Sequence, residues 1–223
     1  MVEPGTPVLK NLIDSYKKKK ITMIYGPGAS GKTTCCYLCS IQCAKTRSSV
    51  IYIDTENGFN SERFSQLAGE KCADFLKNIF LFRINDFNEQ IKIFKKLKKF
   101  CSNDKLQVII VDTIGNHYRR ELKKDYKKAN REIMIQMKIL EEIASENNKI
   151  ILLTNQVYQN IEKQNEITLV GGNMMKCTGD CLIELKKTHD NDRFAVLRKD
   201  YDSDDPLEKK VKFEIREKGI FQT

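Results

Sequence analysis

The sequence lacks the features of a secreted or membrane-spanning chain. No apolar run approaches the ~18 residues that a membrane-spanning helix requires. The N-terminal stretch MVEPGTPVLKNLIDSYKKKK contains no apolar core of the kind that secretory signals carry. The 8 cysteines therefore occur without a secretory signal, which favours a reducing compartment. We expect a soluble, cytoplasmic protein.

The chain also has only 2 histidines, and this scarcity bears on metal binding. Cys36, Cys39 and Cys43 follow one another closely, but a zinc site would need a second pair of ligands. His117 and His189 do not supply that pair at a ligand-like spacing. On a helix the three cysteines share one face, so we expect small, buried side chains under a sheet. The remaining candidates for a second ligand pair are Cys177 and Cys181.

Acidic residues are outnumbered, which leaves a formal net charge of +9. Lysines cluster at residues 17–20, 95–99 and 123–128. Such an excess favours a polyanionic partner such as nucleic acid. A solvated, lysine-rich surface is the alternative interpretation, because charge alone does not identify a ligand.

No Pro/Ser-rich linker and no internal repeat divides the 223 residues, a length that fits one compact domain. Short apolar runs alternate with amphipathic segments, which is typical of parallel strands joined by helices. The run LQVIIVD (106–112) is apolar almost throughout and predicts a central parallel strand. The other predicted strands are 21–25, 49–54, 79–84 and 149–156, and the predicted helices are 31–46, 61–69, 87–101 and 129–144.

The pattern changes after residue 156. CLIELKK, RFAVLRK and VKFEI read as short strands without helices between them, which indicates an antiparallel extension at one edge of the sheet. We therefore predict an α/β fold: a doubly wound, mainly parallel sheet with helices on both faces and a C-terminal antiparallel extension.

The segment GPGASGKT (26–33) matches the phosphate-loop pattern G-x-x-x-x-G-K-[ST] in full and lies between a predicted strand and a predicted helix. In such a loop backbone N–H groups and the helix N-terminus face the phosphates. Lys32 would bind the β- and γ-phosphates, and the Thr33 hydroxyl would ligate Mg²⁺. We predict ATP and Mg²⁺ as cofactors, bound by Gly26, Pro27, Gly28, Ala29, Ser30, Gly31, Lys32, Thr33 and Thr34.

Two further acids bear on hydrolysis. Asp112 ends the central strand and is placed to orient Mg²⁺ through a water, although an acid there also caps a turn. A second carboxylate near the γ-phosphate would polarise the attacking water. Many phosphate-loop proteins carry it directly after the Mg²⁺ acid, but position 113 is threonine. Glu56, in IYIDTEN, is available from another strand, and Asp54 lies beside it.

Several segments together carry a family resemblance that extends over nearly the whole chain. The combination of TEN…SERF with TNQVY is more specific than the phosphate loop alone. Through these segments the chain resembles the RecA-like recombinase family, and within it most closely the archaeal RadB paralogues. The resemblance implies a RecA-like phosphate-loop ATPase core. The segments are GPGASGKTT (26–34), YIDTEN with SERF (52–57, 61–64), VIIVDTIGNHYRREL (108–122), TNQVY (154–158), Gly171-Gly172 and the C-terminal RFAVLRK with F-E-I and Gly219-Ile220.

The resemblance also assigns roles. Glu56 matches the family's water-activating glutamate, which leaves Asp54 as a strand-end acid. Arg63 falls where the family packs a guanidinium against adenine, and a helix-surface arginine is the alternative. Gln156 falls on the residue that senses the γ-phosphate, and a satisfied strand-end amide is the alternative. The expected catalytic residues are thus Glu56, Lys32 and Gln156.

Two DNA-binding loops of the family also map onto the chain. The first lies near residues 115–131, where cations and an aromatic side chain suit single-stranded DNA, although a solvated helix start has the same composition. The second spans residues 157–170 and has little net charge. The candidate DNA-binding residues are His117, Tyr118, Arg119, Arg120, Lys123 and Lys124.

The chain departs from the full recombinases in two ways. It begins 25 residues before the phosphate loop, so we expect a single domain over 1–223 without the N-terminal DNA-binding domain. It also contains no Phe-x-x-Ala polymerisation tetrad. Both departures favour a weakly ATP-hydrolysing accessory or mediator of recombination. Its expected partners are single-stranded DNA, the main recombinase, other repair proteins and a second copy of itself.

Two other functions fit the same residues. One is a nucleotide-gated protein-binding module with little turnover. The other is a RecA-fold ATPase of a pathway that does not involve DNA. A kinase of small molecules is disfavoured, because the sequence shows no arginine-rich lid segment.

Overall fold

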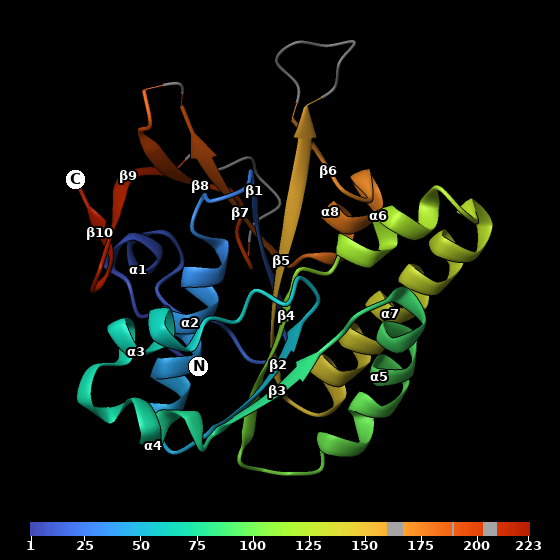
Figure 1. Ribbon diagram of the computed structural model, residues 1–223, viewed down its shortest axis with the longest axis horizontal. Helices are drawn as coiled ribbons and strands as arrows, with labels where there is room; N and C mark the ends of the chain where they lie inside the picture. The colour runs from blue at the N-terminus through green and yellow to red at the C-terminus, as the bar shows by residue number, and fades with distance from the viewer. Residues whose placement is uncertain (160–166, 189, 203–208) are drawn as a thin grey trace.

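A computed structural model describes residues 1–159, 167–188, 190–202 and 209–223. In Figure 1 a twisted sheet lies between two layers of helices. The sheet runs in the order β10-β9-β8-β7-β1-β5-β4-β2-β3. Its interior strands are almost wholly buried, as expected of a parallel sheet that is covered on both faces. The prediction of a doubly wound sheet is confirmed.

Six strands of the sheet run parallel, and their register decides which residues meet. Tyr25 and Gly26 lie level with Asn155 and Gln156, and Asp54 lies level with Asp112. The carboxyl ends of four strands therefore share one edge of the sheet, where phosphate-binding sites form in this class of fold. The parallel strands are β1 (Ile21–Gly26), β2 (Ser49–Asp54), β3 (Ile79–Arg83), β4 (Leu106–Asp112), β5 (Ile150–Gln159) and β7 (Cys181–Lys187).

The antiparallel extension begins one strand later than the sequence indicates. β7, the CLIELKK strand, pairs with β1 in the parallel sense. It can do so because a short helix, α8 (Gly172–Thr178), precedes it and the chain then returns to the amino end of β1, where the N–H of Asp180 donates to the carbonyl of Ile21. The antiparallel strands that follow are β8 (Arg193–Lys199), β9 (Lys209–Arg216) and β10 (Gly219–Gln222), while β6 (Ile167–Leu169) pairs with the end of β5.

One helical layer packs beside the phosphate loop. Its main member, α2, presents Cys36, Cys39 and Cys43 to the sheet, and all three thiols are buried as predicted. Its first member, α1, was not predicted from the sequence; Thr6 caps this helix by accepting a hydrogen bond from the backbone N–H of Val8. This layer contains α1 (Pro7–Ile13), α2 (Lys32–Lys45), α3 (Ser61–Ala68), α4 (Cys72–Leu76) and a 3₁₀ turn at Gly69–Lys71.

The other layer covers the opposite face of the sheet. Asp86 and Asp125 cap its two long helices by accepting hydrogen bonds from backbone N–H groups three residues on. It contains α5 (Phe87–Phe100), α6 (Asn116–Leu122), α7 (Tyr126–Glu146) and α8. Within the described ranges, no helix has the length and apolar character needed to cross a membrane.

Candidate functional site

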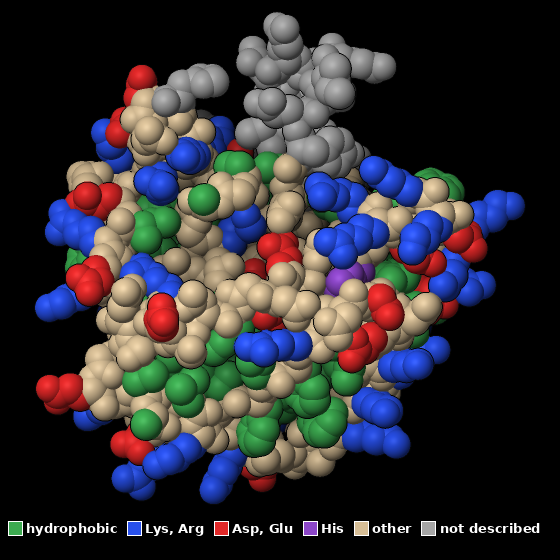
Figure 2. Space-filling model, viewed as in Figure 1, with side chains coloured by type: hydrophobic (Ala, Val, Ile, Leu, Met, Phe, Trp, Pro, Cys, Tyr) green, Lys and Arg blue, Asp and Glu red, His purple; other side chains and the backbone are tan. Residues whose placement is uncertain are grey.

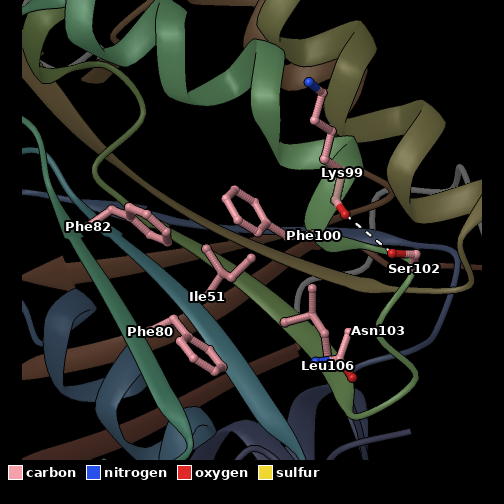
Figure 3. Close-up of a pocket in the computed structure, with 8 residues that line it drawn as sticks. All are labelled: Ile51, Phe80, Phe82, Lys99, Phe100, Ser102, Asn103 and Leu106. Atoms are coloured by element: carbon pink, nitrogen blue, oxygen red, sulfur yellow. Dashed lines mark hydrogen bonds between the residues drawn. The ribbon is translucent and has the colours of Figure 1, made fainter.

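A hollow of about 210 Å³ at the carboxyl edge of the sheet is lined by most of the residues predicted to bind or act on the nucleotide. A larger hollow of about 340 Å³ lies beside the edge strand β3, where Phe80 and Phe82 face Ile51 and Phe100 (Figure 3). Among the described residues, Lys99 is the one charged residue that lines the larger hollow, and the hollow therefore does not have the convergent charged groups of a phosphate or catalytic site. The smaller hollow is lined by Gly28, Ala29, Ser30, Gly31, Lys32, Thr33, Thr34, Glu56, Thr113, Gln156 and Ile215.

The phosphate loop connects β1 to α2, and two of its glycines are sterically required. A Cβ on Gly26 would lie 2.3 Å from the carbonyl oxygen of Leu185 on the neighbouring strand. Gly31 is the N-cap of α2 and has a φ of +108°, a backbone conformation that residues other than glycine rarely adopt. The loop therefore turns tightly and leaves the first N–H groups of α2 directed at the hollow.

Lys32 lies at the base of this loop and is almost buried, with 7% of its surface exposed. Its ammonium donates hydrogen bonds to the carbonyl oxygens of Gly26 at 2.9 Å and Pro27 at 2.7 Å. Burial lowers the pKa of Lys32, while the carboxylates of Asp112 and Glu56 act in the opposite direction. The cation is thus held by loop carbonyls at the position where a phosphate group would compete for it.

Ser30 supplies a direct test of whether the loop suits an anionic ligand. Its hydroxyl oxygen is buried and has no hydrogen-bond partner among the described residues. A buried hydroxyl without a partner is costly, and a phosphate oxygen in the hollow would satisfy it. No atom lies within 4 Å of the position that a Cβ on Gly28 would occupy, so the loop leaves space for a ligand at this point. These features fit the triphosphate of a nucleotide.

Asp112 ends β4 beneath the loop and is held by two hydroxyl donors. Tyr52 donates to Oδ2 at 2.8 Å, and Thr154 donates to Oδ1 at 2.5 Å. Burial raises the pKa of Asp112, and the charge of Glu56 adds to this effect, while the hydroxyls of Thr154, Thr33 and Tyr52 lower it. Thr33, the predicted Mg²⁺ ligand, thus lies near the acid that is predicted to orient Mg²⁺ through a water.

Glu56 follows the end of β2 and reaches across to two neighbours. Its Oε1 accepts hydrogen bonds from Thr113 Oγ1 at 3.0 Å and from Gln156 Nε2 at 2.7 Å. Asp54 is 1% exposed, and its carboxylate accepts from the backbone N–H groups of Glu56, Gly58 and Phe59. The two acids of IYIDTEN therefore differ, because one faces the hollow and the other organises the loop.

Arg63 lies outside the hollow. Its guanidinium donates to the backbone carbonyls of Arg216 and Glu217, both at 2.8 Å, and to the side chain of Gln66 at 2.9 Å. These bonds tie α3 to the turn between β9 and β10. The adenine contact implied by the resemblance stays a prediction.

The candidate DNA-binding residues separate into two groups. His117 and Tyr118 are each 3% exposed, and their ring atoms bond to the carbonyl of Ile84 and the side chain of Asn130. In this conformation neither ring is accessible to a base. The cationic members are exposed on and after α6, where Figure 2 shows Lys and Arg side chains gathered; they are Arg119, Arg120, Lys123 and Lys124.

Two residues of these surfaces were not predicted from the sequence. Tyr126 is 67% exposed at the start of α7, two residues after Lys124, and is the accessible aromatic side chain that Tyr118 was expected to be. Ile215 of β9 lines the hollow although it lies far from the phosphate loop in the sequence. Within the second predicted DNA-binding loop, residues 160–166 lie outside the described residues.

Comparisons with known proteins identify the family. A family model described as Rad51 matches residues 2–223. The DNA repair and recombination protein RadB of Methanocaldococcus jannaschii is 36% identical over 215 residues, which cover 94% of this chain and 96% of the relative. That of Thermococcus sibiricus is 34% identical over 224 residues, which cover 99% and 94%. A solved structure, "Crystal structure of the RadB recombinase", superposes with a TM-score of 0.82 at 28% identity, and both chains are covered in full. The chain belongs to the Rad51 family.

Proposed function

We propose that this chain is an ATP-binding, weakly ATP-hydrolysing protein of DNA repair and homologous recombination. One observation carries the proposal: the phosphate loop, Lys32, Glu56 and Gln156 line a single hollow. These are the groups that phosphoryl chemistry requires, namely donors for the phosphates, a charge for their oxygens and a carboxylate for water. The relatives named RadB are described as DNA repair and recombination proteins, which supports the biological role.

In this proposal the polar and charged residues in and beneath the hollow have distinct tasks. Lys32 leaves its loop carbonyls and binds the terminal phosphates, and Ser30 gains the partner that it lacks. Thr33 and Asp112 supply oxygen atoms, which Mg²⁺ prefers as ligands. Bound Mg²⁺ would neutralise negative charge on the phosphate oxygens. Glu56 then orients water, and Gln156 reports whether a γ-phosphate is present.

The exposed cations form the proposed surface for single-stranded DNA. Arg119, Arg120, Lys123 and Lys124 neutralise backbone phosphates, and Tyr126 offers a ring on which a base can stack. His117 and Tyr118 support this surface from within, because their polar atoms bond to the protein. The surface follows directly from β4, whose last residue is Asp112, so it lies close to the nucleotide site along the chain.

We further propose a single domain over residues 1–223 that acts as a recombinase accessory or mediator rather than as the main recombinase. The absence of a Phe-x-x-Ala tetrad from the sequence supports this, because the family uses that tetrad to polymerise. The partners would then be single-stranded DNA, the main recombinase and other repair proteins. Mass measurement in solution, with and without ATP–Mg²⁺ and DNA, decides whether the chain also associates with itself.

The decisive experiment measures ATP binding and single-turnover hydrolysis, with and without single-stranded DNA. Wild-type protein should bind ATP–Mg²⁺ saturably, Lys32→Ala should not, and Glu56→Gln should bind ATP but hydrolyse it far more slowly. Absence of saturable ATP binding, or binding unaffected by Lys32→Ala, would refute the proposal. Equal and negligible turnover in wild type and Glu56→Gln would instead indicate a nucleotide-gated binding module.

A further inference from the structure

The carboxylate of Glu56 is held asymmetrically. Thr113 and Gln156 both donate to Oε1, at 3.0 and 2.7 Å. One carboxylate oxygen can accept two such bonds, because each oxygen has two lone pairs. Among the described residues, no side chain donates to Oε2. The two oxygens are therefore not equivalent, and Oε2 is the one left for a water in the hollow.

Thr113 is the more firmly fixed of the two donors. It is 2% exposed, and its backbone N–H donates to the hydroxyl of Thr55 at 3.0 Å. The same hydroxyl donates to the carbonyl of Thr113 at 2.7 Å, and the N–H of Thr55 donates to the carbonyl of Asp112 at 3.0 Å. These three hydrogen bonds hold Thr55, the residue before Glu56, against the backbone of Asp112 and Thr113 at the end of β4.

Gln156 is fixed less closely. Its side chain is half-buried at the carboxyl end of β5, and its one described side-chain bond is the bond to Glu56. Under the proposed function this amide turns to a phosphate oxygen when nucleotide binds. Glu56 would then lose one of its two donors and keep only Thr113.

We propose that Thr113 is a positioning residue for Glu56: its hydroxyl holds Oε1 and so directs Oε2 toward the water-binding side of the hollow. The inference rests on the proposed hydrolysis at this site. In the sequence, Thr113 stands out only because many phosphate-loop proteins carry an acid at this position; the hydrogen bond to Glu56 gives the threonine a role of its own. Asp54 completes the arrangement, since it fixes the backbone of Glu56 while Thr113 fixes the carboxylate.

The test compares Thr113→Val, which removes the hydroxyl at nearly constant shape, with Thr113→Ser, which keeps it. Single-turnover hydrolysis should fall on the order of tenfold in Thr113→Val, the effect of losing one hydrogen bond to a charged group. ATP affinity should not change, and Thr113→Ser should restore the rate. In a Glu56→Gln background, Thr113→Val should have no further effect, because both changes remove the same function. If valine disturbs the fold, Thr113→Ala serves as the second variant.

A crystal structure of Thr113→Val without nucleotide supplies a readout independent of activity. Glu56 should leave its position beside residue 113, while Asp54 keeps its three backbone contacts. The inference is wrong if Glu56 stays in place, if Thr113→Val hydrolyses ATP at the wild-type rate, or if it slows Glu56→Gln further. A wild type that binds ATP without hydrolysing it would refute the proposed hydrolysis alone, and the crystal structure would still decide the role of Thr113.

Discussion

Replacing Asp54 with asparagine tests whether this acid organises the loop that carries Glu56. Asp54 is 1% exposed, and its Oδ1 accepts from the N–H groups of Glu56 at 3.2 Å and Gly58 at 3.1 Å. Its Oδ2 accepts from the N–H of Phe59 at 2.8 Å. Asparagine has the same shape and can keep the first oxygen, but it places an N–H₂ group against the N–H of Phe59.

The expected cost follows from these contacts. One hydrogen bond to a charged acceptor is lost, which costs about 1.5–3 kcal/mol of unfolding free energy. The two bonds that remain become neutral and weaken, since bonds to ionised acceptors are roughly twice as strong. Together these changes should lower the unfolding free energy by roughly 2–4 kcal/mol. For a chain of 223 residues this is a fall in melting temperature of roughly 5–15 °C.

Thermal and urea unfolding measure this effect, and Asp104→Asn provides a matched control. Asp104 is an exposed aspartate in the turn before β4, so its replacement should change stability by less than about 0.5 kcal/mol. Amide hydrogen exchange should also accelerate at Glu56, Gly58 and Phe59 in Asp54→Asn. Equal melting temperatures for the two variants would refute the reasoning, because three buried bonds would then contribute nothing.

Four further predictions concern the two buried charges of the site and the proposed DNA-binding surface. Burial lowers the pKa of Lys32 below its ordinary 10.5, so the unfolded state binds the proton more strongly than the folded state. As the pH rises toward 10.5, the unfolding free energy of the wild type should therefore increase relative to that of Lys32→Met, which urea unfolding at a series of pH values measures. Burial raises the pKa of Asp112 above its ordinary 3.8, so the folded state binds the proton more strongly; Asp112→Asn should gain stability relative to wild type as the pH rises above that value, while Mg²⁺-dependent ATP binding is lost. In binding to single-stranded DNA, Lys123→Ala should make the slope of log K against log salt concentration less steep by about 0.7, because one phosphate contact is lost. Tyr126→Ala should weaken binding by about 1–3 kcal/mol, and Tyr118→Phe should not; equal effects of the two tyrosine changes in a fluorescence titration would contradict the assignment.

The fold was predictable because most of its information is periodic. Alternating apolar runs and amphipathic segments located the central strands and long helices, and the cysteine face of α2 followed from helical spacing. The sense of β7 was not predictable in this way. Its direction depends on α8, a helix of seven residues that begins at Gly172 after the N-cap Gly171, and glycines give little helical signal. Short helices contribute too few turns for a periodic pattern.

The residues of the candidate site were likewise predictable only in part. The phosphate loop is contiguous, so its residues could be named from the sequence. The donors around Asp112 could not, because Tyr52 and Thr154 come from two other strands and meet it only through the sheet register. The burial of Tyr118 did have a signal. Ile114, Tyr118 and Leu122 follow one another at intervals of four residues, the spacing of a buried helix face.

Electrostatics gives a second reason, besides its hydrogen bond to Glu56, why position 113 carries a threonine and not an acid. Asp112 already lies in surroundings that disfavour its charged form. A second acid directly after it would bring another carboxylate into the same buried strand end, where like charges repel most strongly. Glu56 instead reaches the hollow from the loop after β2, where it is exposed, and a neutral donor replaces the second charge. Thr113→Glu should therefore destabilise the nucleotide-free protein more than Thr113→Gln, and the difference should grow as the pH rises and the introduced acid ionises.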